Sequence, residues 1–133
     1  MCVALSESTS GVNIQIINSM FHKNNANWGG GLCIYLQKRT HKSYILILNS
    51  TLLENCGYLG GGGVQVRLGE QESGLENYIL FKKVTFVNNT AKFGGGTSIN
   101  AMFVSNVTEA EGILQFTNCS WFNNYGRYSP AVD

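Results

Sequence analysis

The sequence contains little charge and almost no proline or aspartate. Only 13% of its 133 residues are charged, the net charge is +1, and Pro130 and Asp133 are the single proline and aspartate. So small a net charge gives no electrostatic reason to expect a nucleic-acid partner. No apolar run reaches about 18 residues, so we expect no transmembrane helix in this chain. No window of 11 or more residues shows a helical period of 3.6, which argues against helices.

Residues that commonly carry catalysis or bind metals are also scarce. His22 and His41 are the only histidines and have no partner at metal-ligand spacing, and the four cysteines form no C-x-x-C pair. Glu54 is the one glutamate inside a repeated motif. We therefore expect no metal, no cofactor and no catalytic residue, although two carboxylates on stacked loops remain an alternative.

Glycine and asparagine, by contrast, recur in a repeat. Four units align: FHKNNANWGGG from Phe21, LLENCGYLGGG from Leu52, FVNNTAKFGGG from Phe86 and WFNNYGRYSPA from Trp121. Three residues after the first position comes an asparagine: Asn24, Asn55, Asn89 and Asn124. Two residues further comes a small residue, and two beyond that a bulky one: Trp28, Leu59, Phe93 and Tyr128. Four offsets kept in four copies indicate a repeat architecture.

The segments that flank each unit alternate between apolar and polar residues, which is typical of strands with one buried face. The repeat cores span 14–36, 45–68, 79–103 and 114–133. With three short strands in each repeat, the pattern predicts one all-β domain, a right-handed parallel β-helix of about four coils. We expect the apolar pairs, the Phe21 column, the bulky column that begins at Trp28, and the strands at Leu32, Val64 and Ile99 to face one core.

Stacking of the repeats gives each recurring residue a role. Equivalent positions lie about 4.8 Å apart, so Asn24, Asn55, Asn89 and Asn124 are predicted to form a hydrogen-bonded ladder. The glycine runs predict tight corners, because glycine tolerates positive φ and close backbone approach. The predicted corner glycines are Gly29, Gly30, Gly31, Gly61, Gly62, Gly94, Gly95 and Gly96. Cys2 and Cys33 share a column, where parallel Cβ directions favour stacked thiols over a disulfide.

The repeat resembles a known family. A phenylalanine, an asparagine three residues on and a glycine-rich triplet followed by an aliphatic residue are similar to the repeat of polymorphic outer-membrane proteins and to β-helix repeats of animal cell-surface proteins. Phe21, Asn24 and Gly29–Leu32 carry the match best, with Phe86, Asn89 and Gly94–Gly96. The resemblance implies a pectin-lyase-like β-helix in a surface protein. It specifies a fold more than an activity.

Four sequons give a modest signal about the compartment. They begin at Asn49, Asn88, Asn106 and Asn118, where chance would give about two, and they predict N-glycosylation in an extracellular or cell-surface location. The favoured function is a non-enzymatic scaffold or adhesion surface. The alternative is part of a carbohydrate-active lyase or hydrolase whose catalytic coils lie outside this segment.

The connections between repeats vary in length and charge, and such insertions often carry the binding edge of a solenoid. One connection is basic and its neighbour acidic, so this edge is a candidate surface for a protein or glycan ligand; it comprises Lys38, Arg39, Lys42, Glu70, Glu72 and Glu76. A solvated loop pair is the alternative. Both ends of the sequence fall in mid-repeat, so we expect further β-helix coils at each end.

Overall fold

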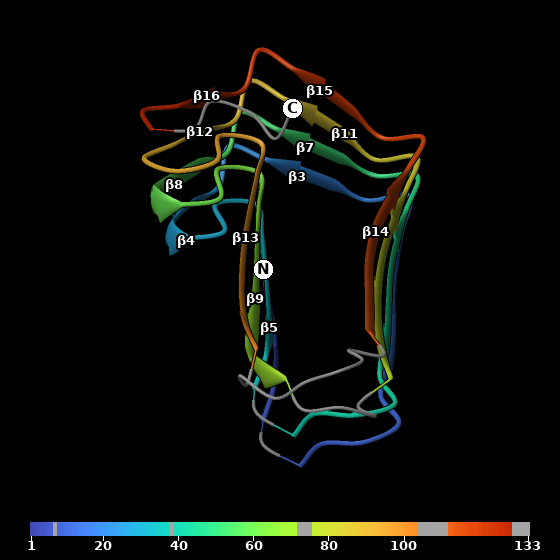
Figure 1. Ribbon diagram of the computed structural model, residues 1–133. Helices are drawn as coiled ribbons and strands as arrows, with labels where there is room; N and C mark the ends of the chain where they lie inside the picture. Colours follow the sequence, from blue (N-terminus) through green and yellow to red (C-terminus); the bar gives the residue numbers. More distant parts are fainter. Residues whose placement is uncertain (7, 38, 72–75, 104–111, 129–133) are drawn as a thin grey trace.

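The computed structural model describes residues 1–6, 8–37, 39–71, 76–103 and 112–128. Within these residues every element is a β-strand and there is no helix (Figure 1). Accordingly, the described chain has no helix that could span a membrane. The predicted all-β parallel solenoid is confirmed, with about three turns.

Four parallel sheets, each four strands deep, build the solenoid. The β5 sheet consists of β1 (Cys2–Leu5), β5 (Leu32–Leu36), β9 (Val64–Gln71) and β13 (Thr97–Phe103). The β6 sheet consists of β2 (Asn13–Ile17), β6 (Tyr44–Leu48), β10 (Asn77–Lys82) and β14 (Gly112–Thr117).

The other two sheets are built from shorter strands. The β7 sheet consists of β3 (Met20–His22), β7 (Thr51–Leu53), β11 (Thr85–Val87) and β15 (Ser120–Phe122). The β8 sheet consists of β4 (Asn25–Trp28), β8 (Cys56–Gly60), β12 (Thr90–Ala91) and β16 (Tyr125–Gly126). The expectation of three strands in each repeat is therefore wrong. The fourth strand, two to five residues long, lies among small residues without apolar alternation.

The sheets enclose a flat, elongated cross-section. In Figure 1 the β5 and β6 sheets form its two long sides, the β7 sheet closes one short end, and the β8 sheet projects outward beyond the corner. Each strand pairs in parallel with its equivalent one repeat away, for example Leu32 with Val64 and Phe21 with Leu52. Residues at equivalent positions consequently form columns along the solenoid axis.

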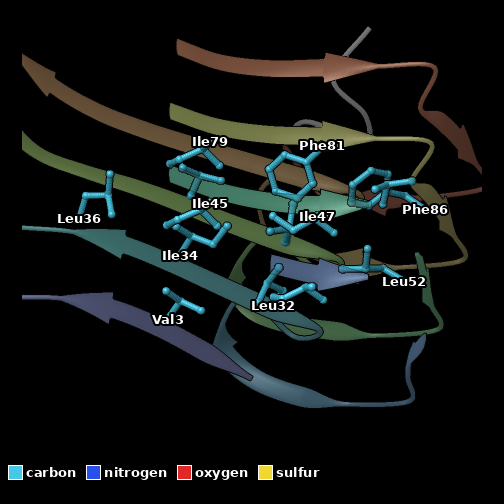
Figure 2. Close-up of a cluster of buried hydrophobic side chains, with 14 of the residues drawn as sticks. Val3, Leu32, Ile34, Leu36, Ile45, Ile47, Leu52, Ile79, Phe81 and Phe86 are labelled. Carbon is cyan, nitrogen blue, oxygen red and sulfur yellow. The ribbon is translucent and has the colours of Figure 1, made fainter. Parts of the chain in front are cut away.

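Apolar columns fill the space between the long sides (Figure 2). Ile34 and Val66 from the β5 sheet lie in one buried cluster with Ile45 and Ile47 from the β6 sheet. Burial of each such side chain stabilises the fold by about 1.5–3 kcal/mol. The predicted Phe21 column is confirmed: its member Phe86 is fully buried, and the Phe86 ring stacks on Trp121 with centroids 5.1 Å apart.

β13, the last strand of the β5 sheet, stays in register with β9 but has no further strand above it. Ile99 stands over Val66 in register, yet 43% of Ile99 is exposed whereas Val66 is fully buried. Ile99 therefore lies in the predicted column. The expectation that it is buried in a closed core is wrong, because β13 is an edge strand.

Left-handed residues turn the chain at two of the corners. Between the β6 and β7 sheets the residues with positive φ are Asn18, Asn49, Lys83 and Asn118. Between the β7 and β8 sheets they are Lys23, Glu54, Asn88 and Asn123. Asparagine is the residue other than glycine that best tolerates this conformation, which explains its frequency at these corners.

The glycine corner differs from the predicted alignment in the second repeat. Gly29, Gly61 and Gly94 share a positive φ of 63°, 63° and 59°, so the second triplet is Gly61–Gly63 and not Gly60–Gly62. Gly60 is an extra residue that pairs with Trp28 after a shift of register, which makes a β-bulge. At the middle glycine of each triplet the backbone of the next coil lies too close for a side chain. A Cβ on Gly30 would lie 2.5 Å from the carbonyl oxygens of both Cys56 and Gly62.

Candidate binding surface

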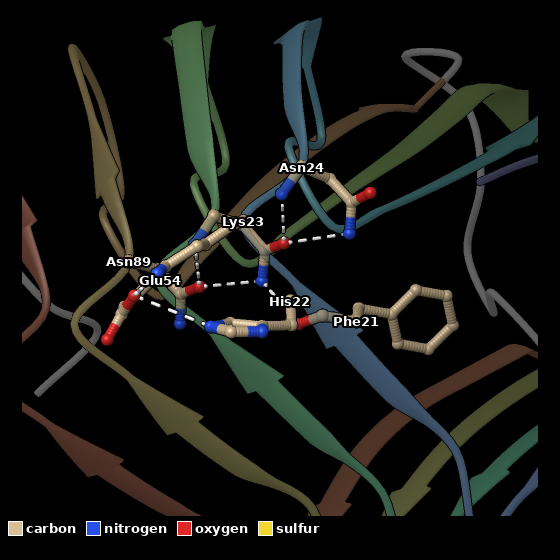
Figure 3. A network of polar contacts seen from close by, with 7 residues as sticks. Phe21, His22, Lys23, Asn24, Glu54 and Asn89 are labelled. Carbon is tan, nitrogen blue, oxygen red and sulfur yellow. Dashed lines mark hydrogen bonds and ion pairs between the residues drawn. The ribbon is translucent and has the colours of Figure 1, made fainter.

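The asparagine column lies inside the β7–β8 corner as a continuous ladder (Figure 3). Asn55 Oδ1 accepts hydrogen bonds from the backbone N and from Nδ2 of Asn24, at 3.0 and 3.1 Å. Asn55 Nδ2 donates to Asn89 Oδ1 and to the Phe21 carbonyl, both at 2.9 Å. Asn89 repeats this pattern with Asn124 and Leu52. Since Asn55 and Asn89 are fully buried, the ladder is internal structure and offers no ligand site.

A small exposed ion cluster lies beside the ladder. Glu54 Oε2 is 3.4 Å from His22 Nε2 and 3.5 Å from Lys23 Nζ (Figure 3). All three side chains are largely exposed, so the cluster stabilises the fold little. His22 belongs to a surface pair and not to a metal site. Among the described residues no three His, Cys, Asp or Glu side chains are grouped to hold a metal ion.

The bulky column lies outside the solenoid, which corrects the expectation that it fills the core. The exposed fractions are 42% for Trp28, 39% for Leu59, 43% for Phe93 and 60% for Tyr128. The β8 sheet projects beyond the corner, so these side chains have no facing sheet to pack against. Phe93 and Tyr128 cover each other instead, as stacked rings with centroids 5.3 Å apart. We call Trp28, Phe93 and Tyr128 the ring column; in the second repeat the bulge puts Gly60, and not Leu59, in register with Trp28.

Three cations lie against aromatic rings on this side of the molecule. The Arg67 guanidinium is 5.5 Å from the Trp28 ring centroid and 5.3 Å from that of Tyr35. Lys92 Nζ lies 5.5 Å from Phe93, and the Arg127 guanidinium lies 5.4 Å from Tyr128. Within the described part of the chain none of the three forms an ion pair with a carboxylate. A ring orients a cation without neutralising its charge, so these cations keep their capacity to bind an anion.

Arg67 belongs to a compact group that we call the Arg67 cluster: Trp28, Tyr35, Gln65 and Arg67. Tyr35 and Arg67 are paired neighbours on β5 and β9, and Gln65 lies two residues before Arg67, on the same face of β9. Gly60 lies against both Trp28 and Gln65. A Cβ at this position would be 3.1 Å from the Trp28 ring and 2.8 Å from Gln65 Oε1.

Gln65 is the unusual member of the cluster. Only 1% of this residue is exposed, and its Nε2 donates to the Val66 carbonyl at 3.2 Å. Its Oε1 is the one buried side-chain oxygen or nitrogen in the described chain without a hydrogen-bond partner. A buried acceptor left unpaired costs about 1–3 kcal/mol. Within the described residues, the Arg67 cluster therefore contains an acceptor without a donor beside a cation without a carboxylate partner.

Cys33 lies next to this cluster. It pairs in register with Cys2 on one side and with Gln65 on the other, and all four cysteines are free thiols. Burial, with a hydrogen bond and charge repulsion from Cys2, raises the pKa of the Cys33 thiol to about 11. Cys33 is thus no reactive thiolate at neutral pH.

A second outward face, on the β6 sheet, is apolar and shallow. A depression of about 390 Å³ lies over β6, β10 and β14, lined by Tyr44, Leu46, Leu48, Leu80, Phe81, Lys82, Gln115 and Thr117. One cation and no carboxylate line it. Among the residues that line this depression no cation lies against an aromatic ring, as three cations do on the β8 side. The depression therefore offers fewer groups for specific recognition.

The predicted loop edge is described only in part. Lys38 and Glu72 lie outside the described residues, as does the sequon residue Asn106. Lys42 and Glu76 occupy equivalent left-handed positions on successive coils, and Arg39 is exposed. The three other sequon asparagines, Asn49, Asn88 and Asn118, are exposed corner residues.

Sequence reasoning missed the Arg67 cluster because its members come from two different repeats. Trp28 and Arg67 are far apart along the chain and meet only because β4 pairs with β8, the strand of the next repeat that leads into β9. One signal was present: within Val64–Leu68, Arg67 places a charge at an outward position of an otherwise uncharged alternating strand. Comparisons with protein families, with curated proteins and with solved structures give no significant match.

Proposed function

We propose that this chain is a non-enzymatic β-solenoid segment of an extracellular or cell-surface protein, which serves as a scaffold and presents a binding surface on its β8 side. The observation that carries the proposal is the set of three exposed cations held by rings and free of carboxylate partners within the described residues. Rings combined with unpaired cations are typical of recognition surfaces, and a packed core beneath them supplies rigidity.

The carboxylates of the described chain favour this proposal over an enzyme. Glu54 is engaged by His22 and Lys23 at one corner, and Glu76 lies at a different corner. Glycoside hydrolysis typically uses two carboxyl groups that flank one glycosidic bond, and these two lie at different corners. A carbohydrate-active enzyme with its catalytic coils elsewhere is the rival, and assays for depolymerisation of polysaccharides distinguish it.

Two further parts of the proposal come from the sequence. The repeat resembles that of polymorphic outer-membrane proteins, and we propose this kinship together with further coils that continue the sheets at both ends. The extracellular location is supported by Asn49, Asn88 and Asn118, whose exposed side chains leave room for a glycan. Left-handed corners favour asparagine, and this preference explains part of the excess of sequons. The proposed location therefore depends on the exposed binding surface as well as on the sequons.

Attachment of the purified chain to cells tests the proposal. Beads coated with the chain should bind cells, and a triple variant with Arg67, Lys92 and Arg127 changed to Gln should lose most of that attachment. A control variant with Lys82 and Lys83 changed to Gln removes exposed cations from a different corner and should keep it. Absence of attachment by the unaltered chain would contradict the proposed function.

A further inference from the structure

We propose that the Arg67 cluster binds the terminal sugar of a glycan chain and that this sugar carries a carboxylate. The inference rests on the proposed function, because it assigns a ligand class to one part of the same surface. Three properties of the cluster lead to it: a guanidinium without a carboxylate partner among the described residues, an exposed ring and a buried acceptor without a donor there.

The guanidinium supplies the charge recognition. Arg67 is exposed, and the Trp28 and Tyr35 rings at 5.5 and 5.3 Å restrict its orientation. An arginine fork donates two parallel hydrogen bonds to a carboxylate, and a pre-oriented fork loses less side-chain entropy on binding. No carboxylate of the described residues occupies this fork, so none of them competes there with a carboxylate from a ligand.

The ring supplies the second contact. Trp28 is 42% exposed, so part of the indole remains open to a ligand beside the arginine. The face of an aromatic ring carries partial negative charge and attracts the polarised C–H groups of a pyranose ring. A sugar that places its carboxylate on Arg67 can therefore pack its apolar face on Trp28.

The buried acceptor favours a ligand rich in hydroxyl groups. Gln65 Oε1 lies beneath the β8 bulge, close to the Trp28 ring, and lacks a donor. Because this oxygen is buried, a sugar hydroxyl, or a water that it orders, reaches it only when the Trp28 side chain shifts, and the hydrogen bond it donates then offsets the cost of the unpaired oxygen. A simple anion lacks the apolar face and the hydroxyl groups that complete this set of contacts.

Other anionic polymers fit the surface less well. An acidic peptide would bind best by adding a strand, but β9 already pairs with β5 and β13, and β8 with β4 and β12. Nucleic acid needs several phosphate contacts, and a net charge of +1 does not favour them. The cluster joins one tryptophan to one arginine across a single coil step, a size that matches one sugar ring at a chain end.

Calorimetric titration of the whole chain tests the proposal with defined probes. We expect 3′-sialyllactose, which ends in a carboxylate-bearing sugar, to bind at least tenfold more tightly than lactose, its neutral counterpart. Arg67→Gln should reduce this affinity at least about tenfold, as expected for a lost hydrogen bond to a charged group. Lys83→Gln is the control, because Lys83 is an exposed cation at a different corner, outside the proposed binding surface, and it should leave the affinity unchanged.

Several outcomes would overturn the inference. Equal binding of lactose and sialyllactose would show that the carboxylate is not recognised, and equal losses of affinity in Arg67→Gln and Lys83→Gln would indicate nonspecific attraction. Tighter binding of polygalacturonate, poly-glutamate or single-stranded DNA would assign the surface to internal uronates, acidic peptides or nucleic acid instead. Unfolding midpoints of all variants establish that they fold. If cells attach to Arg67→Gln as to the unaltered chain, this inference fails and the proposed function stands.

Discussion

The asparagine column and the ring column belong to the same corner of each repeat, one inside the β7–β8 corner and the other outside it. The inner position is asparagine in all four repeats, whereas the outer one is Trp28, Gly60, Phe93 or Tyr128. Inside, the amides of Asn55 and Asn89 are each tied to two neighbouring coils by bonds that no other side chain reproduces. Outside, the residue varies from glycine to tryptophan. The comparison separates positions dictated by the fold from positions open to recognition.

The largest effect is expected on the inner column. Asn89→Ala removes the acceptor for the backbone N and Nδ2 of Asn55 and the donor to the Leu52 carbonyl. Leaving three buried groups unpaired should lower the free energy of unfolding by about 4–6 kcal/mol. Urea denaturation measures this loss. Asn24→Ala, at the exposed end of the ladder, is the control and should cost less than half as much.

The second prediction compares two phenylalanines of one repeat. Phe86 is fully buried and stacks on Trp121, whereas Phe93 is 43% exposed. Phe86→Ala should cost about 3–5 kcal/mol of stability because it leaves a cavity in the core. Phe93→Ala should cost less than about 1 kcal/mol. Equal unfolding midpoints for the two variants would show that the inside and outside of this corner have been wrongly assigned.

The third prediction concerns two glycines that differ in their surroundings. A Cβ on Gly95 would lie 2.5 Å from backbone atoms of Tyr125, whereas a Cβ on Gly11 would meet nothing within 4 Å. Gly95→Ala should cost about 2–3 kcal/mol, because backbone must move to make room. Gly11 has a φ of +67°, so Gly11→Ala should cost only about 1 kcal/mol of backbone strain. Thermal unfolding followed by circular dichroism gives both values.

The smallest effect is expected from Cys33, and it depends on pH. Its pKa is raised from 9.0 to about 11, so the folded chain holds the thiol proton more tightly than the unfolded chain. The resulting stabilisation is fully present below pH 9 and is lost as the pH rises towards 11. The stability difference between the unaltered chain and Cys33→Ser should therefore change across this window. A disulfide-linked Cys2–Cys33 peptide in a non-reduced digest would contradict the stacked thiols.

The sequence predicted those parts of the fold that depend on one residue type at one offset. Asn55 and Asn89 recur because only an amide serves as both donor and acceptor along the ladder, and the Phe21 column recurs because the core needs bulk there. The fourth strand gave no such signal. Strands as short as Thr90–Ala91 are too brief for alternation to appear.

Two errors have a common physical cause. The alignment of the repeats placed the second triplet at Gly60–Gly62, because one glycine in a run of four cannot be told from the next. Trp28 and Phe93 were expected in the core because both side chains are large and apolar. Size and hydrophobicity do not indicate on which side of a corner a side chain lies. Both errors concern the β8 sheet, and the Arg67 cluster that depends on this sheet was missed for the same reason.

The direction of the interstrand hydrogen bonds has a mechanical consequence. The strands run across the solenoid axis, and the bonds that join successive coils run along it. A pulling force along the axis therefore acts on one coil interface at a time and peels coils from an end, while the coils behind stay intact. Equivalent asparagines are 31, 34 and 35 residues apart, which sets the length released at each step. At about 3.3–3.6 Å per extended residue, each peeled coil would lengthen the chain by roughly 100–125 Å, so the solenoid would extend under tension in discrete steps.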